Sequence, residues 1–229
     1  MKILCTICVR GGSKGLRNKN IKNINGKPLV SYTINQAIRS KIFDNIAISS
    51  DSYKILNIAK KFGIKDLIKR PKNLAIDSAP KIPVIKHCLV EMEKRYKKKY
   101  DLIVDLDATA PLRKIIDIKK AVNKMIKSKA SNLFSVCESR SNPYFNAVEI
   151  VNNKVQQLKK SKKNITSRQS APKVFDINAS IYIWRRDFLN KYESLISKKT
   201  TIYIMPESRS LDIDTNFHFK LARFLINKK

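Results

Sequence analysis

Apolar runs of strand length alternate with segments of helical periodicity along the first part of the chain. The apolar runs predict strands at about 3–9, 45–50, 64–68, 101–106 and 132–137. Apolar residues that recur every three to four positions predict helices at about 29–39, 53–62, 82–96 and 116–127. Asp51 stands where its side chain would cap the second helix, and Gly63 stands where that helix would end. This rhythm is typical of an α/β fold that has a mainly parallel sheet with helices on both faces.

The rhythm breaks at about residue 138. Segment 138–176 contains Pro143, Pro172 and a cluster of lysines, and it shows no helical pattern. We interpret it as an inserted, hairpin-like segment. Regular structure returns with strands at 179–184 and 201–205, a short helix at 187–192 and a C-terminal helix at 216–226. We therefore predict a single domain over 1–229 that carries one insertion at 138–176.

Charge is the feature of the composition that could change this interpretation. The chain has 48 Lys and Arg against 18 Asp and Glu, a formal net charge of +30. Such a balance is expected of a nucleic-acid-binding module. The lysines, however, fall on nearly every predicted exposed face, and the abundance of Lys, Asn and Ile fits compositional drift. We therefore attribute the charge to composition and expect no specific nucleic-acid partner.

The sequence also shows no apolar run of about 18 residues that would span a membrane. Its first apolar run is followed by Arg10 and lacks the small-residue cleavage site of a signal peptide. We expect no membrane partner and a cytoplasmic protein. Cys5 and Cys8 form a C-x-x-C pair, but their spacing in a strand would direct them to opposite faces. We expect the cysteines to be reduced core residues.

The loop Arg10–Asn20 follows the first predicted strand directly. In an open α/β sheet, ligands bind beyond the carboxyl ends of the strands. Glycines in this loop would allow backbone N–H groups to approach an anion closely, and its basic side chains are Arg10, Lys14, Arg17 and Lys19. The loop lacks both the P-loop pattern and the dinucleotide-binding fingerprint. It predicts a phosphate-binding cradle, with a solvated turn as the alternative.

Acidic residues are scarce in this chain, so the pair Asp212 and Asp214 stands out. On an extended segment, carboxylates at i and i+2 point the same way. Such hard oxygen ligands suit Mg²⁺. Capping of the following helix by Asp214 or Thr215 is the alternative. Two further loops, 70–77 and 107–113, follow predicted strands at the same sheet edge and strengthen the prediction of a site there.

Three motifs together resemble the acylneuraminate cytidylyltransferases. They are Arg10-x-Gly-Ser-Lys-Gly-x-x-x-Lys-Asn20, the Thr-x-Pro-Leu-Arg run that ends at Arg113, and the Asp-Ile-Asp-Thr run that starts at Asp212. The resemblance covers essentially the whole chain. It implies a Rossmann-like, three-layer nucleotidyltransferase fold, CTP as substrate and Mg²⁺ as cofactor. It also implies a homodimer, or a dimer of such dimers, in which segment 138–176 completes the neighbouring site.

The resemblance also assigns roles to residues. Catalytic roles fall to Lys19, Arg10, Asp212 and Asp214, with the two aspartates as metal ligands. The residues implied in nucleotide binding are Arg10, Gly12, Ser13, Lys14, Gly15, Lys19, Asn20, Arg70 and Lys81. Those implied in sugar binding are Asp107, Thr109, Arg168, Gln169, Asn178 and Tyr182. Among them, Arg168 would reach in from the partner subunit.

Departures from the sialic-acid enzymes point to a related substrate. Asp107 replaces a glutamine that contacts the sugar in those enzymes, and Lys81 stands where a small hydroxyl residue near the nucleotide is common. The runs 105–113, 142–146 and 168–173 look most like those of CMP-legionaminic acid synthetases. We therefore expect a nonulosonic acid of the legionaminic type. Sialic acid, pseudaminic acid, 3-deoxy-manno-octulosonate and a catalytically inactive scaffold remain alternatives.

Overall fold

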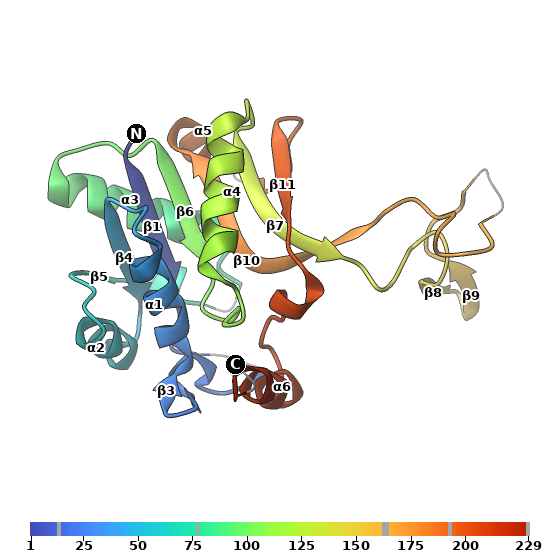
Figure 1. The fold of residues 1–229 in the computed structure, drawn as a ribbon, viewed down its shortest axis with the longest axis horizontal. Helices are drawn as coiled ribbons and strands as arrows, with labels where there is room; N and C mark the ends of the chain where they lie inside the picture. Colours follow the sequence, from blue (N-terminus) through green and yellow to red (C-terminus); the bar gives the residue numbers. More distant parts are fainter. Residues whose placement is uncertain (13–14, 77, 162–164, 192–193, 228–229) are drawn as a thin grey trace.

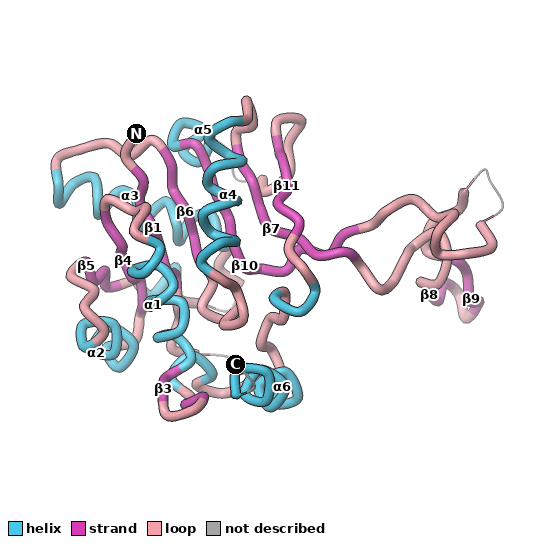
Figure 2. The backbone as a smooth tube through the Cα atoms, viewed as in Figure 1, coloured by secondary structure: helices cyan, strands magenta, loops and turns pink. Residues whose placement is uncertain are grey.

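The fold centres on one mixed sheet. The computed structural model describes residues 1–12, 15–76, 78–161, 165–191 and 194–227. Its seven-stranded sheet has the order β11-β7-β10-β6-β1-β4-β5 (Figures 1 and 2). Neighbouring strands pair in parallel except β10, which runs antiparallel to both β6 and β7. The bounds are β1 Ile3–Cys8, β4 Asn45–Ser50, β5 Asp66–Lys69, β6 Leu102–Leu106, β7 Asn132–Glu138, β10 Phe175–Arg185 and β11 Thr200–Ile204. The predicted, mainly parallel sheet is confirmed.

Helices cover both faces of the sheet and give three layers. On one face lie α1 (Leu29–Ser40), α2 (Tyr53–Lys61) and α4 (Ile115–Lys127), and on the other α3 (Lys81–Tyr96) and α5 (Arg186–Lys191). Strand β1 supplies both cores, because successive side chains alternate between faces. Cys5 belongs to the first core, whereas Leu4 and Cys8 belong to the second. The predicted opposition of Cys5 and Cys8 is confirmed, and all four cysteines are free.

A smaller third core lies below the carboxyl edge of the sheet. The C-terminal helix α6 (Asn216–Asn227) contributes Phe219 and Ala222 to it. Leu16 and Ile213 join the same cluster, with Ile213 completely buried. Leu16 belongs to the first loop, and Ile213 lies between the two aspartates of the acidic pair. Burial of these apolar side chains therefore brings two segments that are far apart in the sequence to one place.

The inserted segment extends away from the sheet (Figure 1). Beyond β7 the chain forms the predicted hairpin, with strands β8 (Val148–Val151) and β9 (Lys154–Gln157). The turn residues Asn152 and Asn153 both have positive φ, as a tight two-residue hairpin turn requires. The hairpin leaves large apolar side chains exposed: Val148 at 64%, Ile150 at 73% and Val155 at 70%.

Two predictions about α2 and its surroundings were wrong. Asp51 does not cap this helix: the N-cap residue is Ser52, without a side-chain capping bond, and Asp51 Oδ1 instead accepts a hydrogen bond from Gly11 N. Strand β5 begins at Asp66 rather than at residue 64. The reason is that Ile64 N–H bonds to the Ala59 carbonyl and closes the helix end beside Gly63, which has φ +89°.

Short 3₁₀ turns complete the chain at Lys19–Ile21 (η1), Lys72–Leu74 (η2) and Glu207–Arg209 (η3), and a small ladder pairs β2 (Asn23–Ile24) with β3 (Lys27–Pro28). Arg209 of η3 forms two bonds of 2.7 and 2.9 Å with the buried carboxylate of Asp117 in α4. This contact fixes the segment that leads to Asp212. Within the described residues, no helix is long and apolar enough to cross a membrane.

Candidate active site

A cleft of about 520 Å³ opens at the carboxyl ends of the parallel strands. It lies where the chain order reverses, because β1 is followed by β4 on one side while β6 pairs with β1 on the other. Such a switch point is the expected ligand site of an open α/β sheet. The structure brings these predicted site residues into the lining: Arg10, Gly15, Lys19, Asn20, Arg70, Lys81, Asp107, Thr109, Asp212 and Asp214.

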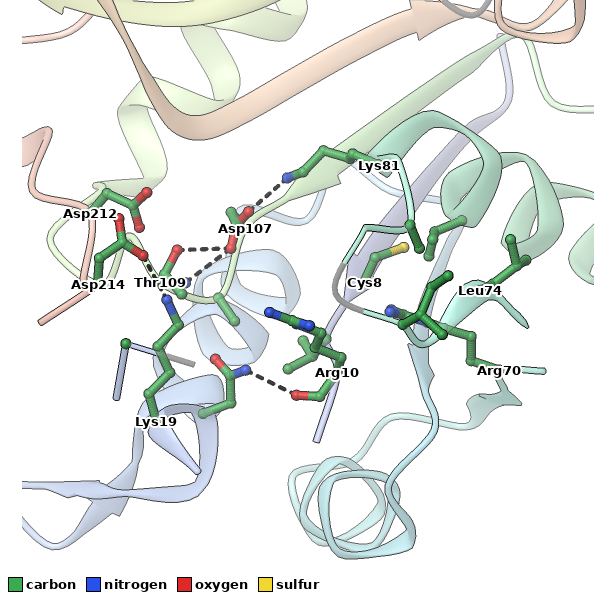
Figure 3. Close-up of a pocket in the computed structure, with 17 residues that line it drawn as sticks. Cys8, Arg10, Lys19, Arg70, Leu74, Lys81, Asp107, Thr109, Asp212 and Asp214 are labelled. Carbon is green, nitrogen blue, oxygen red and sulfur yellow. Dashed lines mark hydrogen bonds and ion pairs between the residues drawn. The ribbon is translucent and has the colours of Figure 1, made fainter. Parts of the chain in front are cut away.

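Lys19 connects the first loop to the acidic pair. It begins the turn η1, and the preceding residue, Asn18, has φ +56°. The Lys19 ammonium donates to Asp214 Oδ1 at 2.9 Å (Figure 3). It also donates to Ile213 O at 2.6 Å. Its side chain is largely buried, so this cation is held in one position at the edge of the cleft.

Glycines in the first loop serve packing as well as ligand approach. A Cβ on Gly15 would lie 2.5 Å from Asp214 O, so only glycine lets the loop pack against the acidic segment. A Cβ on Gly11 would lie 2.9 Å from Ser52 Cβ. At Gly12 no described atom would come within 4 Å of an added Cβ, so protein packing does not require glycine there. The predicted ligands Ser13 and Lys14 lie outside the described residues.

The opposite wall combines a buried cation with apolar side chains. Arg70 is buried, and its guanidinium donates to Ser49 O at 2.9 Å. Asn20 donates to Arg10 O at 3.3 Å, while its buried Oδ1 has no hydrogen-bond partner among the described residues. The apolar part of this wall is formed by Val9, Leu74, Ile76, Ala79 and Val84. A mostly apolar surface with a few fixed polar groups suits a planar heterocycle.

Asp107 and Lys81 form an ion pair in the wall that continues from β6. Lys81 Nζ lies 2.6 Å from Asp107 Oδ2 (Figure 3). It also lies 3.2 Å from Asp105 Oδ2. Asp107 Oδ1 also accepts the hydroxyl and the N–H of Thr109. Burial opposes both charged forms, yet the Lys81 charge lowers the pKa of Asp107, and Asp107 raises the pKa of Lys81 well above its usual value.

Asp212 is in the opposite electrostatic situation. Its Oδ1 is buried and has no hydrogen-bond partner among the described residues. Burial, and then the charge of Asp107, raise the pKa of Asp212 to about 6. Asp214, two residues on, is mostly exposed and bonds to Lys19. An unsatisfied buried carboxylate beside an exposed one has the donor chemistry of a site for a hard divalent cation.

The sequence profile of the family described as Cytidylyltransferase matches residues 4–227. The chain belongs to the cytidylyltransferase family.

Relatives of this cytidylyltransferase match it from end to end. It is 47% identical to "CMP-N,N'-diacetyllegionaminic acid synthase" of Campylobacter jejuni and 46% identical to "Post-translational flagellin modification protein B" of Campylobacter coli, covering 100% of this chain and 96% of each relative. Among solved structures, a CMP:2-keto-3-deoxy-manno-octonic acid synthetase complexed with CTP superposes with a TM-score of 0.73 at 16% identity, over 100% of this chain and 99% of that one. This likeness shows the fold, which is the predicted Rossmann-like one.

Four residues predicted to bind the sugar do not line this cleft in their own chain. Arg168 and Gln169 lie in the inserted segment, where Arg168 donates to Arg140 O at 2.6 Å. Asn178 is buried between Ser135 and Ser210, to which it is hydrogen-bonded. Tyr182 lies just behind the wall: it stacks on Trp184, and the Lys81 ammonium sits 4.3 Å from its ring centroid.

Sequence reasoning missed two acidic residues that support this site. Asp51 fixes the first loop through its 2.8 Å bond with Gly11 N. Asp105 is only 1% exposed; one oxygen accepts the Thr6 hydroxyl at 2.8 Å and the other pairs with Lys81. A signal for Asp105 was present, because a carboxylate inside an otherwise apolar strand must have a buried partner. Nothing in the sequence around Asp51 indicated that its side chain would bond to the first loop rather than cap the following helix.

Proposed function

We propose that this cytidylyltransferase transfers CMP from CTP to the anomeric hydroxyl of a nonulosonic acid of the legionaminic type and releases pyrophosphate. The observation that carries the proposal is the Lys19 ammonium, which joins the basic loop to the Asp212–Asp214 segment at the cleft. A fixed cation beside a carboxylate pair is suited to a polyphosphate chain and its metal ion. The full-length similarity to a CMP-N,N'-diacetyllegionaminic acid synthase supports the choice of sugar.

The cleft offers a separate region for each part of the substrates. The apolar wall beside Arg70 would receive the cytosine and ribose, and the loop with Arg10 and Lys19 would receive the triphosphate. The wall around Asp107 and Thr109 would receive the sugar acid. Catalysis then consists of holding the attacking hydroxyl in line with the α-phosphorus and of neutralising charge on that phosphate.

Mg²⁺ fits the acidic pair. Oδ1 of Asp212, which is buried without a hydrogen-bond partner among the described residues, would coordinate the ion, and Asp214 would contribute a second carboxylate. No group of three or more His, Cys, Asp or Glu side chains suited to a metal occurs in the described part of the chain. Two carboxylates suffice for Mg²⁺, because it is commonly bound by one or two carboxylates together with substrate phosphates. When bound, the ion would supply charge neutralisation at the phosphates.

Pyrophosphate release tests the proposal directly. The purified protein is assayed with CTP, UTP, GTP and ATP against legionaminic, pseudaminic and sialic acids and 3-deoxy-manno-octulosonate. We expect the largest kcat/KM for CTP with a legionaminic acid. A clear preference for another sugar acid would replace the proposed sugar, and no release with CTP and any of them would overturn the proposal.

Lys19→Ala tests the role of the cation at the α-phosphate. We expect turnover to fall about a hundredfold or more, by analogy with the loss of a preorganised transition-state donor. Lys27→Ala is the matched control, since Lys27 is an exposed lysine outside the cleft. Turnover near wild type in Lys19→Ala would refute this role.

We also propose that the protein is a homodimer whose inserted segment reaches the partner's site. Support comes from the exposed apolar side chains of the hairpin, which no described part of the chain covers. Further support is that Arg168 and Gln169 lie in this segment, outside the cleft of their own chain. Sedimentation velocity gives the oligomeric state, and a monomer at assay concentration would contradict the proposal.

Subunit mixing tests whether Arg168 acts on the partner's site. Lys19→Ala and Arg168→Ala, each of which we expect to be inactive alone, are unfolded together and refolded. Half of the randomly formed dimers are then mixed, and one of the two sites in each mixed dimer is intact, so about a quarter of the wild-type rate should return. No recovery from a mixture that does form dimers would place Arg168 in its own subunit's site or in neither.

A further inference from the structure

Lys81 makes its strongest contacts with the wall assigned to the sugar rather than with the nucleotide region. It is the first residue of α3, and its side chain reaches across to the end of β6 (Figure 3). Its ammonium joins Asp105 and Asp107, the residues on either side of Leu106, and it lies over the Tyr182 ring. Two acidic partners and an aromatic face hold this cation in place.

Asp107 retains hydrogen-bonding capacity toward the cleft. An ionised carboxylate offers about four acceptor positions. In the part of the chain that the structure describes, three donors approach it: the N–H and hydroxyl of Thr109 at Oδ1, and Lys81 at Oδ2. The side chain is 20% exposed and lines the cleft. One acceptor position on Oδ2 therefore remains for a ligand.

The charge of Asp107 restricts what that ligand group can be. A fixed carboxylate repels both the triphosphate and the carboxylate of a sugar acid. It attracts hydroxyl and amide N–H donors, and a carboxylate acceptor makes such hydrogen bonds stronger than a neutral acceptor would. The group suited to Asp107 is therefore an uncharged hydroxyl or N–H donor rather than a phosphate or a carboxylate.

We propose that Lys81 and Asp107 form a single sugar-recognition unit, in which Asp107 accepts a hydroxyl or amide N–H of the sugar acid and Lys81 holds that carboxylate in position. Lys81 is then a positioning residue for the sugar and not a nucleotide ligand. This inference rests on the proposed function. It also connects two separate departures from the sialic-acid enzymes. Asp107 stands in place of the usual glutamine, Lys81 stands in place of the small hydroxyl residue, and the two contact each other.

A double-mutant cycle tests the proposal, with KM and kcat measured for both substrates in Lys81→Met, Asp107→Asn and the double variant. We expect each single change to raise the KM for the sugar acid about tenfold, as the loss of one charged hydrogen bond predicts. The KM for CTP should stay within about twofold and kcat should change less than the sugar KM. The double variant should be no worse than Asp107→Asn, because residues that act as a unit are not additive.

Controls separate positioning from general damage. Lys94→Met removes an exposed lysine from the same helix and should leave all constants unchanged. Lys81→Gln keeps hydrogen-bond donors without the charge and should give a sugar KM between those of wild type and Lys81→Met. It also replaces Lys81→Met if that variant does not fold.

Three results would overturn the inference: a raised KM for CTP in Lys81→Met, an unchanged KM for the sugar in Asp107→Asn, or effects that multiply in the double variant. Multiplying effects would mean that Lys81 contacts substrate independently. Failure of the proposed function would look different, because the wild-type protein would then show no transfer from CTP to any sugar acid.

Discussion

Asp107 and Asp212 line the same cleft, yet their surroundings treat their charges in opposite ways. Asp107 is paired with Lys81 and bonded to Thr109, and its pKa is lowered. Asp212 keeps a buried oxygen without a partner among the described residues, and its pKa is raised to about 6. Both oxygens of Asp107 have partners in the protein, whereas Oδ1 of Asp212 is buried with none among the described residues. The difference separates the carboxylate that we propose contacts the sugar acid from the one that we propose binds Mg²⁺.

The largest expected effect is on catalysis at Asp212. Asp212→Asn keeps the size of the side chain but removes the charge, and we expect turnover to fall about a hundredfold or more, by analogy with lost transition-state stabilisation. Pyrophosphate release at saturating CTP and Mg²⁺ measures this. Lys27→Ala, an exposed change outside the cleft, serves as the control here as well. Turnover within a few-fold of wild type would mean that Asp212 has no catalytic role.

The same substitution should stabilise the protein in the absence of metal. A raised pKa means that the folded state favours the protonated carboxyl, so ionisation destabilises it. This cost is absent below about pH 4, grows as the pH rises to about 6 and is then constant, reaching up to about 3 kcal/mol for a shift of about two units. Urea unfolding between pH 4 and 8 should show that Asp212→Asn has a larger free energy of unfolding than wild type, and that this difference grows as the pH rises. A difference in the free energy of unfolding that is absent at pH 8, or that grows toward low pH, would contradict the raised pKa of Asp212.

Asp107→Asn should change stability in the opposite direction and destabilise the folded protein. Because Lys81 lowers the pKa of Asp107, the ionised form stabilises the folded state at neutral pH. Lys81 keeps Asp105 as a partner in the variant, so we expect a loss of about 1–3 kcal/mol in the free energy of unfolding at pH 7.5. Urea unfolding measures it beside Asp212→Asn. A gain in stability would mean that the two carboxylates do not differ as the structure indicates.

The smallest expected effect is on thermal stability with Mg²⁺ alone. A ligand at ten times its Kd stabilises a protein by about 1.4 kcal/mol, or a few degrees in Tm for a chain of this size. We expect this shift in the wild type and its loss in Asp212→Asn, with NaCl at matched ionic strength as the control for screening. Equal shifts in Tm for both proteins would mean that Asp212 does not bind the Mg²⁺.

The sheet and helices were predictable because their signal is local. Apolar runs and helical spacing placed each main strand and helix within four residues of its observed bounds. The largest differences are the start of β10, at Phe175 rather than 179, and the start of β5, which the closing bond of α2 moves to Asp66. The assignment of Asp51 as a helix cap failed for a related reason. A carboxylate before a helix can bond to either of two nearby N–H groups, and in the fold it bonds to Gly11, forty residues earlier in the chain.

Many residues that line the cleft were predictable from the sequence, but the contacts between them were not. Glycines next to basic residues after a strand, and a spaced acidic pair, are visible in the sequence. That Lys19 meets Asp214 depends on Leu16 and Ile213 sharing one apolar cluster with α6. That Gly15 must be glycine depends on the carbonyl of Asp214. No pattern within a window of the sequence contains either contact.

The sequence by itself determined the order of strands and helices, the family, and the residue types available for chemistry, because periodicity and motif spacing are properties of neighbouring positions. Only the tertiary structure decided which of those residues meet. It gave Asp107 and Asp212 opposite pKa shifts, and it joined Lys81 to Asp107 across the cleft wall. The physical reason is that a side chain's charge state depends on its burial and on charges a few ångströms away. Those neighbours are chosen by packing rather than by order along the chain.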